Sequence, residues 1–294
     1  MNPSGVLLVD KPVGPTSHDL VQATRRSTGI RRVGHAGTLD PFASGLLLIL
    51  IGTATRLSEY FLGMPKEYRA TVELGKETTT HDVEGEVART NPAWRELRPQ
   101  EVEAALDSLR GPILQRPPVY SAKKLQGEAA HRRVRRGEEV ELEPVEVTIH
   151  RLELLEMALP KLEVEILCSS GTYIRAVARD LGRVLGVGGH LSSLRRTAIG
   201  PHSVASALTY ADIGQPQAIW ENLTSPAEAL GHLPGFEVGP EEAARVRQGR
   251  FLPFPTETPP GDGPFRVLLH GDLVAVAGRK GDQLRPQKVF GAED

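Results

Sequence analysis

The fold is decided by a stretch near the amino terminus, residues 31–51, which reads RRVGHAGTLDPFASGLLLILI. Its loop portion holds three glycines, which permit a tightly turning backbone. Asp40 stands before Pro41, and this proline biases it toward extended backbone. The apolar run 46–51 is too short to span a membrane and fits a buried strand, although its periodicity also allows a helix. The stretch therefore predicts a polar loop mounted on a rigid, buried element.

The carboxylate of this loop, Asp40, allows two interpretations. An aspartate before proline is common in turns, where its side chain bonds nearby backbone amides. However, His35 and Thr38 place further polar groups among the glycines, directly beside a very apolar run. That context favours a functional site, while the composition of the loop alone favours a turn.

Composition indicates an ordinary globular protein. The chain has 294 residues, of which 39% are hydrophobic and 24% are charged, enough for one large domain and a small one. A single cysteine, Cys168, excludes a disulfide framework and a cysteine zinc site, and the nine histidines show no metal-ligand spacing. We find no secretory signal and no membrane span, and we therefore expect a cytoplasmic protein without a bound metal.

Basic residues gather in pairs although the net charge is only −2. The pairs are Arg25-Arg26, Arg31-Arg32, Lys123-Lys124, Arg132-Arg133, Arg135-Arg136 and Arg195-Arg196. Any single pair fits a solvated helix face, but a basic stripe on a nearly neutral protein is compatible with binding phosphates. The charge pattern therefore permits a nucleic-acid partner.

Two motifs carry a family resemblance. Residues 34–41, GHAGTLDP, followed by Ser-Gly at 44–45, resemble the catalytic motif of the TruB family, the bacterial tRNA pseudouridine-55 synthases. Residues 168–175, CSSGTYIR, resemble the second motif of that family, whose arginine, here Arg175, pairs with the catalytic aspartate. Both motifs are long and ordered, which makes them far more specific than a lone Asp-Pro pair.

The resemblance implies roles for the residues of a site. Asp40 is the catalytic carboxylate, and Tyr68, in a K-x-Y segment, lines the uracil pocket as a stacking platform. His35 enters the RNA loop and helps to hold the flipped nucleotide. Tyr173 and Leu194 line the pocket.

The residues themselves keep other roles open. Tyr68 also fits an aromatic that packs on a sheet, and Arg175 also fits an ion pair with Asp180 or a solvated position. The opening segment 11–17, KPVGPTS, resembles the family too. Its Lys11, which we count among the substrate-binding residues, belongs either to a stiff turn that packs against the catalytic loop or to an exposed cation.

Two segments depart from the family pattern. Thr79 stands where the family usually has an aspartate, within the polar turn 78–85, TTTHDVEG. Residues 130–134, AHRRV, lack the aromatic, tyrosine-containing pattern expected in the basic RNA-gripping insertion at about 115–145. These departures leave the two catalytic motifs intact.

The periodicities predict an α+β fold. We expect the main strands at 5–10, 46–51, 66–75, 145–155 and 161–168, and helices at 19–28 with a Thr16 or Ser17 cap, at 53–61 with a threonine cap, at 99–110 and at 174–185. The resemblance implies the pseudouridine synthase fold, a mixed, mainly antiparallel sheet, for a catalytic domain of residues 1–232. Residues 233–294 predict a small β-rich domain with a hairpin at 265–277, and its end resembles a PUA-like RNA-binding domain.

The resemblance implies an isomerase that converts uridine 55 in the T-arm loop of tRNA to pseudouridine. The reaction breaks the bond from ribose to N1 and remakes it to C5 without a redox change, so no cofactor is required. Three roles of Asp40 are compatible with this reaction: it attacks C1′ of ribose, it attacks C6 of uracil, or it removes a 2′ proton. The expected partner is the T stem-loop of tRNA, and we expect a monomer with no membrane and no obligate protein partner.

Two other functions are compatible with the residues. One is a non-catalytic RNA-binding module of the same fold. The other is a small-molecule hydrolase that uses Asp40 with a second carboxylate, but no second acid stands in a comparable glycine-rich motif. Turnover on tRNA separates the isomerase from the binding module.

Overall fold

The computed structural model describes most of the chain. The described residues are 3–121, 124, 125, 128, 129, 133, 136, 138, 140, 142–255 and 261–291. The unusual segment 130–134, apart from Arg133, and much of the predicted RNA-gripping insertion therefore lie outside them. No helix among the described residues is long and apolar enough to cross a membrane.

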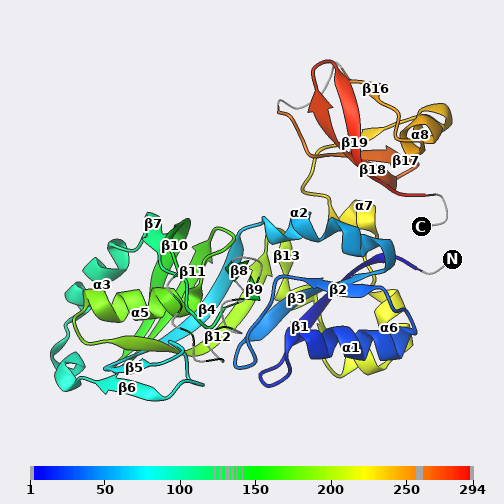
Figure 1. The fold of residues 1–294 in the computed structure, drawn as a ribbon. Helices are drawn as coiled ribbons and strands as arrows, with labels where there is room; N and C mark the ends of the chain where they lie inside the picture. The colour runs from blue at the N-terminus through cyan, green and yellow to red at the C-terminus, as the bar shows by residue number, and fades with distance from the viewer. Residues whose placement is uncertain are drawn as a thin grey trace. The chain divides into compact units, whose positions relative to one another are not determined.

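The chain divides into two compact units (Figure 1). Unit 1 comprises Met1–Leu39, Leu47–Leu62 and Ser206–Asp294, and unit 2 comprises Asp40–Leu46 and Gly63–Ala205. Each unit therefore combines segments that are distant in the sequence.

The helices and strands of unit 1 come from both ends of the chain. They are β1 (Gly5–Lys11), α1 (Ser17–Thr28), β2 (Val33–Ala36), the later part of β3 (Ser44–Ile51), the 3-10 helix η1 (Gly52–Leu57), α2 (Ser58–Leu62), β14 (Leu208–Thr209), η4 (Asp212–Gly214), α6 (Pro216–Glu221), α7 (Pro226–Ala229), β15 (Gly235–Glu237), α8 (Pro240–Arg247), β16 (Leu252–Pro253), β17 (Phe265–Leu269), β18 (Asp272–Lys280) and β19 (Gln283–Val289). The apolar run 46–51 is the buried strand β3, which excludes the helical alternative.

The predicted Thr16 cap of helix α1 is confirmed, and the helix begins at Ser17, two residues before the predicted start. Thr16 accepts a hydrogen bond from the Asp19 amide, and the Asp19 carboxylate bonds the Thr16 amide in return. This reciprocal capping box satisfies two of the backbone donors that a helix start leaves unpaired. The helix buries Leu20 and Val21 in a core with β1, β2 and β3.

The start predicted for the second helix is wrong. Segment 53–61 begins as the 3-10 helix η1 and continues as α2, and no side chain caps η1. The Thr53 amide instead donates to the Ser4 hydroxyl at 3.0 Å. A residue far away in the sequence thus supplies the side-chain acceptor at the start of this helix.

The last part of unit 1 forms a five-stranded sheet in the order β15-β17-β18-β19-β16. Strands β17 and β18 pair antiparallel, which confirms the predicted hairpin. Three aromatic rings, Phe236, Phe254 and Phe265, pack against one another in its core, with centroids 5.3–6.0 Å apart.

Unit 2 is built on a long antiparallel sheet. Its elements are β4 (Lys66–Leu74), β5 (Lys76–Thr78), β6 (Val87–Thr90), η2 (Pro92–Glu96), α3 (Pro99–Asp107), β7 (Gly111–Gln115), β8 (Lys124–Leu125), β9 (Glu128–Ala129), β10 (Val145–Ala158), β11 (Lys161–Cys168), α5 (Ile174–Val184), β12 (Gly189–Ile199) and β13 (His202–Ser203). The order is β12-β4-β11-β10-β7, and each of these neighbours pairs antiparallel.

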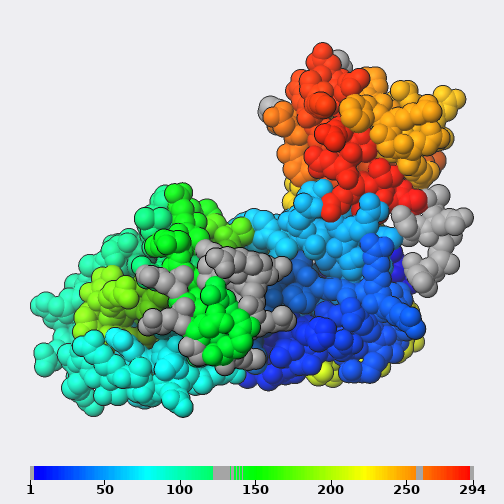
Figure 2. Space-filling model, in the orientation of Figure 1, coloured from blue at the N-terminus to red at the C-terminus, as the bar shows by residue number. Residues whose placement is uncertain are grey.

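A parallel pair makes this sheet mixed. Ser44 and Gly45, at the start of β3, lie opposite Arg195 and Arg196 of β12. The predicted α+β class with a mixed, mainly antiparallel sheet is confirmed. Helix α5 packs on β12 and α3 packs on β10, while the β5–β6 hairpin, cyan in Figure 2, lies at the surface with all of β6 exposed.

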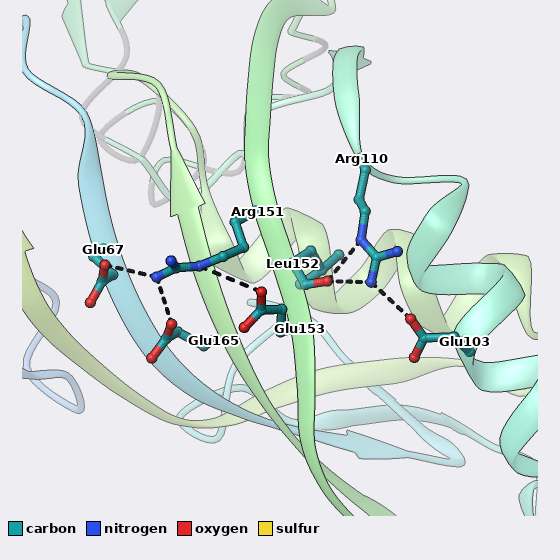
Figure 3. Close-up of polar contacts among 7 residues, drawn as sticks. All are labelled: Glu67, Glu103, Arg110, Arg151, Leu152, Glu153 and Glu165. Atoms are coloured by element: carbon teal, nitrogen blue, oxygen red, sulfur yellow. Dashed lines mark hydrogen bonds and ion pairs between the residues drawn. The ribbon is translucent and has the colours of Figure 1, made fainter.

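The two faces of β4 have opposite characters. Lys66, Tyr68 and Ala70 are buried, whereas Glu67 and Arg69 alternate with them on the other face. On that second face the Arg151 guanidinium lies 3.0 Å from Glu67 and bridges it to neighbouring carboxylates (Figure 3). The strand thus carries a solvated charge network on one side and the residues of the predicted site on the other.

Candidate active site

Asp40 and Arg175 form an ion pair within unit 2. Arg175 lies in the first turn of α5, and its Nε is 3.0 Å from Asp40 Oδ2. The pairing implied by the second motif is therefore present. The alternative pairing of Arg175 with Asp180 is wrong, because Arg179 binds both oxygens of that carboxylate, at 2.8 and 3.0 Å.

The Arg175 guanidinium is held by three further contacts. Its Nη1 lies 3.1 Å from Asp82 Oδ2 and 3.2 Å from the Thr80 carbonyl, and its Nη2 donates to the Tyr120 carbonyl at 2.8 Å. Because the guanidinium is a rigid planar fork, these bonds fix its orientation and position. These contacts thereby set the direction in which Arg175 Nε faces Asp40.

The three charged groups differ in their access to solvent. The side chains of Arg175 and Asp82 are 9% and 3% exposed, whereas that of Asp40 is 36% exposed. A positive neighbour favours the ionised form of a carboxyl group. The arrangement therefore presents one accessible carboxylate, Asp40, which is supported by the buried Arg175–Asp82 pair.

A strained turn holds Asp82. Its Oδ1 accepts hydrogen bonds from the Thr80 hydroxyl and from the Glu84 amide, the latter at 3.0 Å. His81, which precedes it, adopts a left-handed backbone with φ of 62°, a conformation that non-glycine residues rarely take. Burial, reinforced by the charge of Arg179, lowers the pKa of His81 to about 4, so this ring is neutral at neutral pH.

Asp82 was assigned no role from the sequence, although it lies in the same polar turn as Thr79. Its position within a glycine-containing polar turn was the available sign. Thr79, the departure from the family pattern in this turn, is exposed, and its amide donates to the Glu86 carbonyl at 2.9 Å. The departure therefore falls on an outward-facing position of the turn.

Tyr68 and Leu194 lie on one face of neighbouring strands. Tyr68, on β4, is buried with Ile166 opposite on one side and Arg196 opposite on the other. Leu194, two residues before Arg196 on β12, is buried on the same face. Burial raises the pKa of the Tyr68 phenol, and the charge of Asp40 raises it further. The ring is therefore neutral and near the Asp40 carboxylate.

Tyr173 is fixed through its backbone at the start of α5. The Gln115 side chain accepts from the Tyr173 amide at 2.8 Å and donates to its carbonyl at 3.2 Å. Gln115 is completely buried, at the end of edge strand β7. This amide clamp positions the helix that carries Arg175, and no local pattern in the sequence predicts it.

The two remaining predicted residues, His35 and Lys11, belong to unit 1. His35 lies half-buried on β2. Lys11 is fully buried and donates to the Pro12 carbonyl at 2.8 Å, so the exposed-cation alternative is wrong. Close by in the sequence, the Ser17 hydroxyl bonds the Leu39 amide at 2.9 Å and its carbonyl at 3.1 Å. The opening motif thus holds the loop residue that precedes Asp40.

Two buried cations adjoin Tyr68, and both were missed as members of the site. Lys66 donates to the Met64 carbonyl at 2.6 Å. Burial, with the charge of Arg196, lowers the Lys66 pKa to about 8. Arg196 was counted with the surface basic pairs, but its side chain is buried. Among the described residues, no group of three or more His, Cys, Asp and Glu side chains is placed to hold a metal ion.

Comparison with known proteins identifies the family. The model of the TruB family pseudouridylate synthase N-terminal domain matches residues 25–174, and that of the tRNA pseudouridylate synthase B C-terminal domain matches residues 175–233. The chain is similar to the tRNA pseudouridine synthase B of Parasynechococcus marenigrum (strain WH8102), at 46% identity over 99% of this chain and 98% of the relative.

A second relative and a solved structure agree. The tRNA pseudouridine synthase B of Arthrobacter sp. (strain FB24) is 42% identical over 98% of this chain and 96% of its own. The fold matches a structure titled as an H/ACA RNP bound to a substrate RNA containing 2′-deoxyuridine, with a TM-score of 0.75 at 24% identity over 99% of this chain and 86% of that one. The chain therefore belongs to the TruB family of pseudouridylate synthases.

Proposed function

We propose that this protein isomerises uridine 55 in the T-arm loop of tRNA to pseudouridine, with Asp40 as the catalytic carboxylate. Family membership supports the reaction, since its relatives are named tRNA pseudouridine synthase B. The observation that carries the assignment of Asp40 is its geometry. It is the accessible member of a charged trio whose other members, Arg175 and Asp82, are buried.

The proposed chemistry uses few groups. Asp40, ionised beside Arg175, acts on the nucleotide so that the bond from ribose to N1 breaks and the bond from ribose to C5 forms. The detached uracil is held against Tyr68, Leu194 and Tyr173 while it turns. A proton leaves C5 and a proton is gained at N1, so atoms and electrons balance without a cofactor.

The uridine must leave its stack before it reaches Asp40. Extrusion costs a few kcal/mol, and stacking on an aromatic ring such as Tyr68 returns about 1–3 kcal/mol. Further contacts must supply the rest. We assign these to His35, which enters the RNA loop, and to Lys11, whose buried turn supports the contact surface. Replacing His35 with alanine should lower the rate of nucleotide extrusion more than it weakens the first encounter with tRNA.

We assign catalysis to residues 1–232 and additional RNA binding to residues 233–294. The second segment contains the five-stranded sheet of β15 to β19, and none of its residues belongs to the Asp40 motif. A chain that ends at 232 and remains folded should bind tRNA more weakly and with a smaller dependence on salt, because fewer phosphate contacts release fewer counterions. Loss of the single-turnover rate at saturating RNA would contradict this division.

We further propose that the protein acts as a monomer in the cytoplasm and needs no protein partner. The structural relatives include one solved as a Cbf5-Nop10-Gar1 complex, so independence from partners is a specific claim. Light scattering of the purified chain, alone and with tRNA, should give the mass of one copy. Activity that appears only after a cell extract is added would contradict the proposal.

The decisive substrate experiment uses an isolated T stem-loop and an unmodified whole tRNA, each incubated with the protein and a chelator. Both RNAs should gain one pseudouridine, at the uridine that corresponds to position 55. Modification confined to the anticodon arm or to ribosomal RNA would overturn the substrate assignment. Binding without turnover on any tRNA would support the non-catalytic module instead.

A further inference from the structure

Arg196 is a buried arginine in the middle of strand β12, on the face that carries Tyr68. Its side chain is among the largest that are fully enclosed, and the whole residue is 2% exposed. Charged side chains are almost never buried this deeply unless their donors are satisfied. Arg196 Nε donates to the Leu46 carbonyl at 2.7 Å, and Tyr68 lies directly opposite Arg196 where β4 and β12 pair, so that the guanidinium charge acts on the phenol.

The backbone of Arg196 is locked to the same segment that its side chain grips. Gly45 lies directly opposite Arg196 where β3 and β12 pair. A Cβ atom on Gly45 would come within 2.1 Å of the Arg196 carbonyl oxygen and 2.6 Å of its nitrogen, and Gly45 has φ of 104°. Only glycine permits this approach. The exit of the Asp40 loop is therefore fastened to Arg196 twice, at Gly45 and at Leu46.

The directional bonds distinguish this residue from a space-filling one. Burial lowers the pKa of Arg196, because enclosing a charge away from water is unfavourable in itself. An apolar side chain of similar volume would fill the space without that cost. It would not, however, bond the Leu46 carbonyl while placing a cation beside the Tyr68 phenol, and a lysine lacks the planar fork that does both.

We propose that Arg196 is a positioning residue, which fixes the Tyr68 ring relative to the Asp40 loop so that the extruded base stacks in register with the carboxylate. The inference rests on the proposed isomerase function. A displacement of about 1 Å at a reacting centre costs up to a hundredfold in rate. A brace that joins the two parts of the site thus acts on the chemical step while touching neither the RNA nor the reacting atoms.

The test is a double-mutant cycle on the full chain with Arg196→Met and Tyr68→Phe, measured as single-turnover rates on bound T stem-loop. Each single variant should be slower by at least about tenfold. The double variant should be no slower than the slower single one, because either change breaks the same link. Arg151→Met, on the solvated face of the sheet, is the matched control and should change the rate less than twofold.

Two further readouts keep the result interpretable. Titration of the Tyr68 phenol by ultraviolet difference absorbance, parent against Tyr68→Phe, should show a higher pKa in the Arg196→Met background, because a cation that favours the phenolate is gone. Arg196→Lys keeps the charge, so it should return the Tyr68 pKa toward that of the parent while the single-turnover rate stays low. These readouts need no turnover by the parent, so they separate failure of this inference from failure of the proposed function.

Three results would overturn the proposal. The first is a folded Arg196→Met protein with the parent rate. The second is a rate loss that multiplies with that of Tyr68→Phe. The third is a Tyr68 titration that Arg196→Met leaves unchanged. If Arg196→Met fails to fold, Arg196→Lys carries the same cycle, since it preserves the volume and the charge while removing the fork.

Discussion

Two arginines of unit 2 bridge carboxylates at similar distances, but one of them is solvated and the other is buried. Arg151 lies 2.6 Å from Glu165 and 3.0 Å from Glu67, and its side chain is 39% exposed (Figure 3). Arg175 lies 3.0 Å from Asp40 and 3.1 Å from Asp82, and its side chain is 9% exposed. The distances are alike, and burial is what separates the two bridges.

Burial changes what such a bridge does. Solvent screens the Arg151 network, and exposed pairs contribute about 0–1 kcal/mol to stability. Breaking a buried pair costs about 3–5 kcal/mol, because one charge is left without compensation. The Arg175 bridge therefore holds a geometry that the chain must maintain, and Asp40 is the group that this geometry presents. The following predictions test that contrast, from the largest effect to the smallest.

Apart from the loss of the Asp40 carboxylate itself, replacing Arg175 with methionine should have the largest effect. The change leaves Asp82 buried without its cation and Asp40 without its orienting partner. We expect the single-turnover rate to fall by at least about a hundredfold and the free energy of unfolding to drop by about 3–5 kcal/mol. Rapid-quench kinetics and urea unfolding measure the two losses. A folded variant with the parent rate would show that the bridge is only structural.

Asp82→Asn should have a smaller effect of the same kind. The amide keeps the shape and can still accept bonds from Thr80 and Glu84, but it no longer offsets the charge of Arg175. We expect a rate loss of about tenfold with tRNA affinity retained, since Asp82 is remote from solvent. Measuring the single-turnover rate and the dissociation constant for tRNA separates an effect on the reaction from an effect on binding. Weakened binding at an unchanged rate would place Asp82 in the RNA interface instead.

Much of this architecture follows from local sequence. The strand Lys161–Cys168 agrees with the prediction to the residue, and the strand Phe265–Leu269 begins where the predicted hairpin begins, because alternation and turn residues specify short strands. The Thr16 capping box is equally local. The Asp40–Arg175 pair could be predicted because both residues lie in long motifs that resemble one family.

The contacts that organise the site could not be read from local pattern. Arg175 and Asp82 are 93 positions apart, and the Gln115 clamp reaches Tyr173 over 58 positions. Arg196 reaches back 150 positions to bond a backbone carbonyl. Carbonyl acceptors carry no side-chain signature, so a buried arginine that uses them looks in the sequence like any surface arginine.

Lys66, on strand β4 with Tyr68, offers a further test of what burial does to a charged group. Its pKa is lowered by burial, and by Arg196, from 10.5 to about 8. Between these pH values the unfolded chain binds more protons than the folded one, so stability should rise with pH by up to about 3 kcal/mol. Lys66→Met should lose this slope. Urea unfolding at pH 7, 8.5 and 9.5 measures it as the difference between the two proteins.

The titration of Cys168 does not interfere with that comparison. Burial raises the pKa of its thiol to about 11, so it lowers stability as the pH rises above 9. The charge of Lys66 also lowers the pKa of this thiol, so both proteins carry Cys168→Ser in this comparison and the thiol contributes to neither slope. Identical slopes for the parent and Lys66→Met would contradict the pKa assigned to the buried amine.

Arg151→Met should have the smallest effect. The network it belongs to is solvated, so we expect the free energy of unfolding to change by less than about 1 kcal/mol and the single-turnover rate to stay within twofold of the parent. The same assays used for Arg175→Met measure it. A loss comparable to that of Arg175→Met would remove burial as the distinction between the two bridges.

The most direct test of the account is the pseudouridine formed per tRNA by Asp40→Asn beside the parent, mapped by position under single-turnover conditions. The parent should form one per tRNA, at uridine 55. Asp40→Asn should form none while binding the same tRNA within about threefold, since the amide keeps the shape of the side chain and loses its charge. An Asp40→Asn protein, purified free of host enzyme, that still converts uridine 55 would show that the carboxylate on the Arg175 bridge is not the catalytic group.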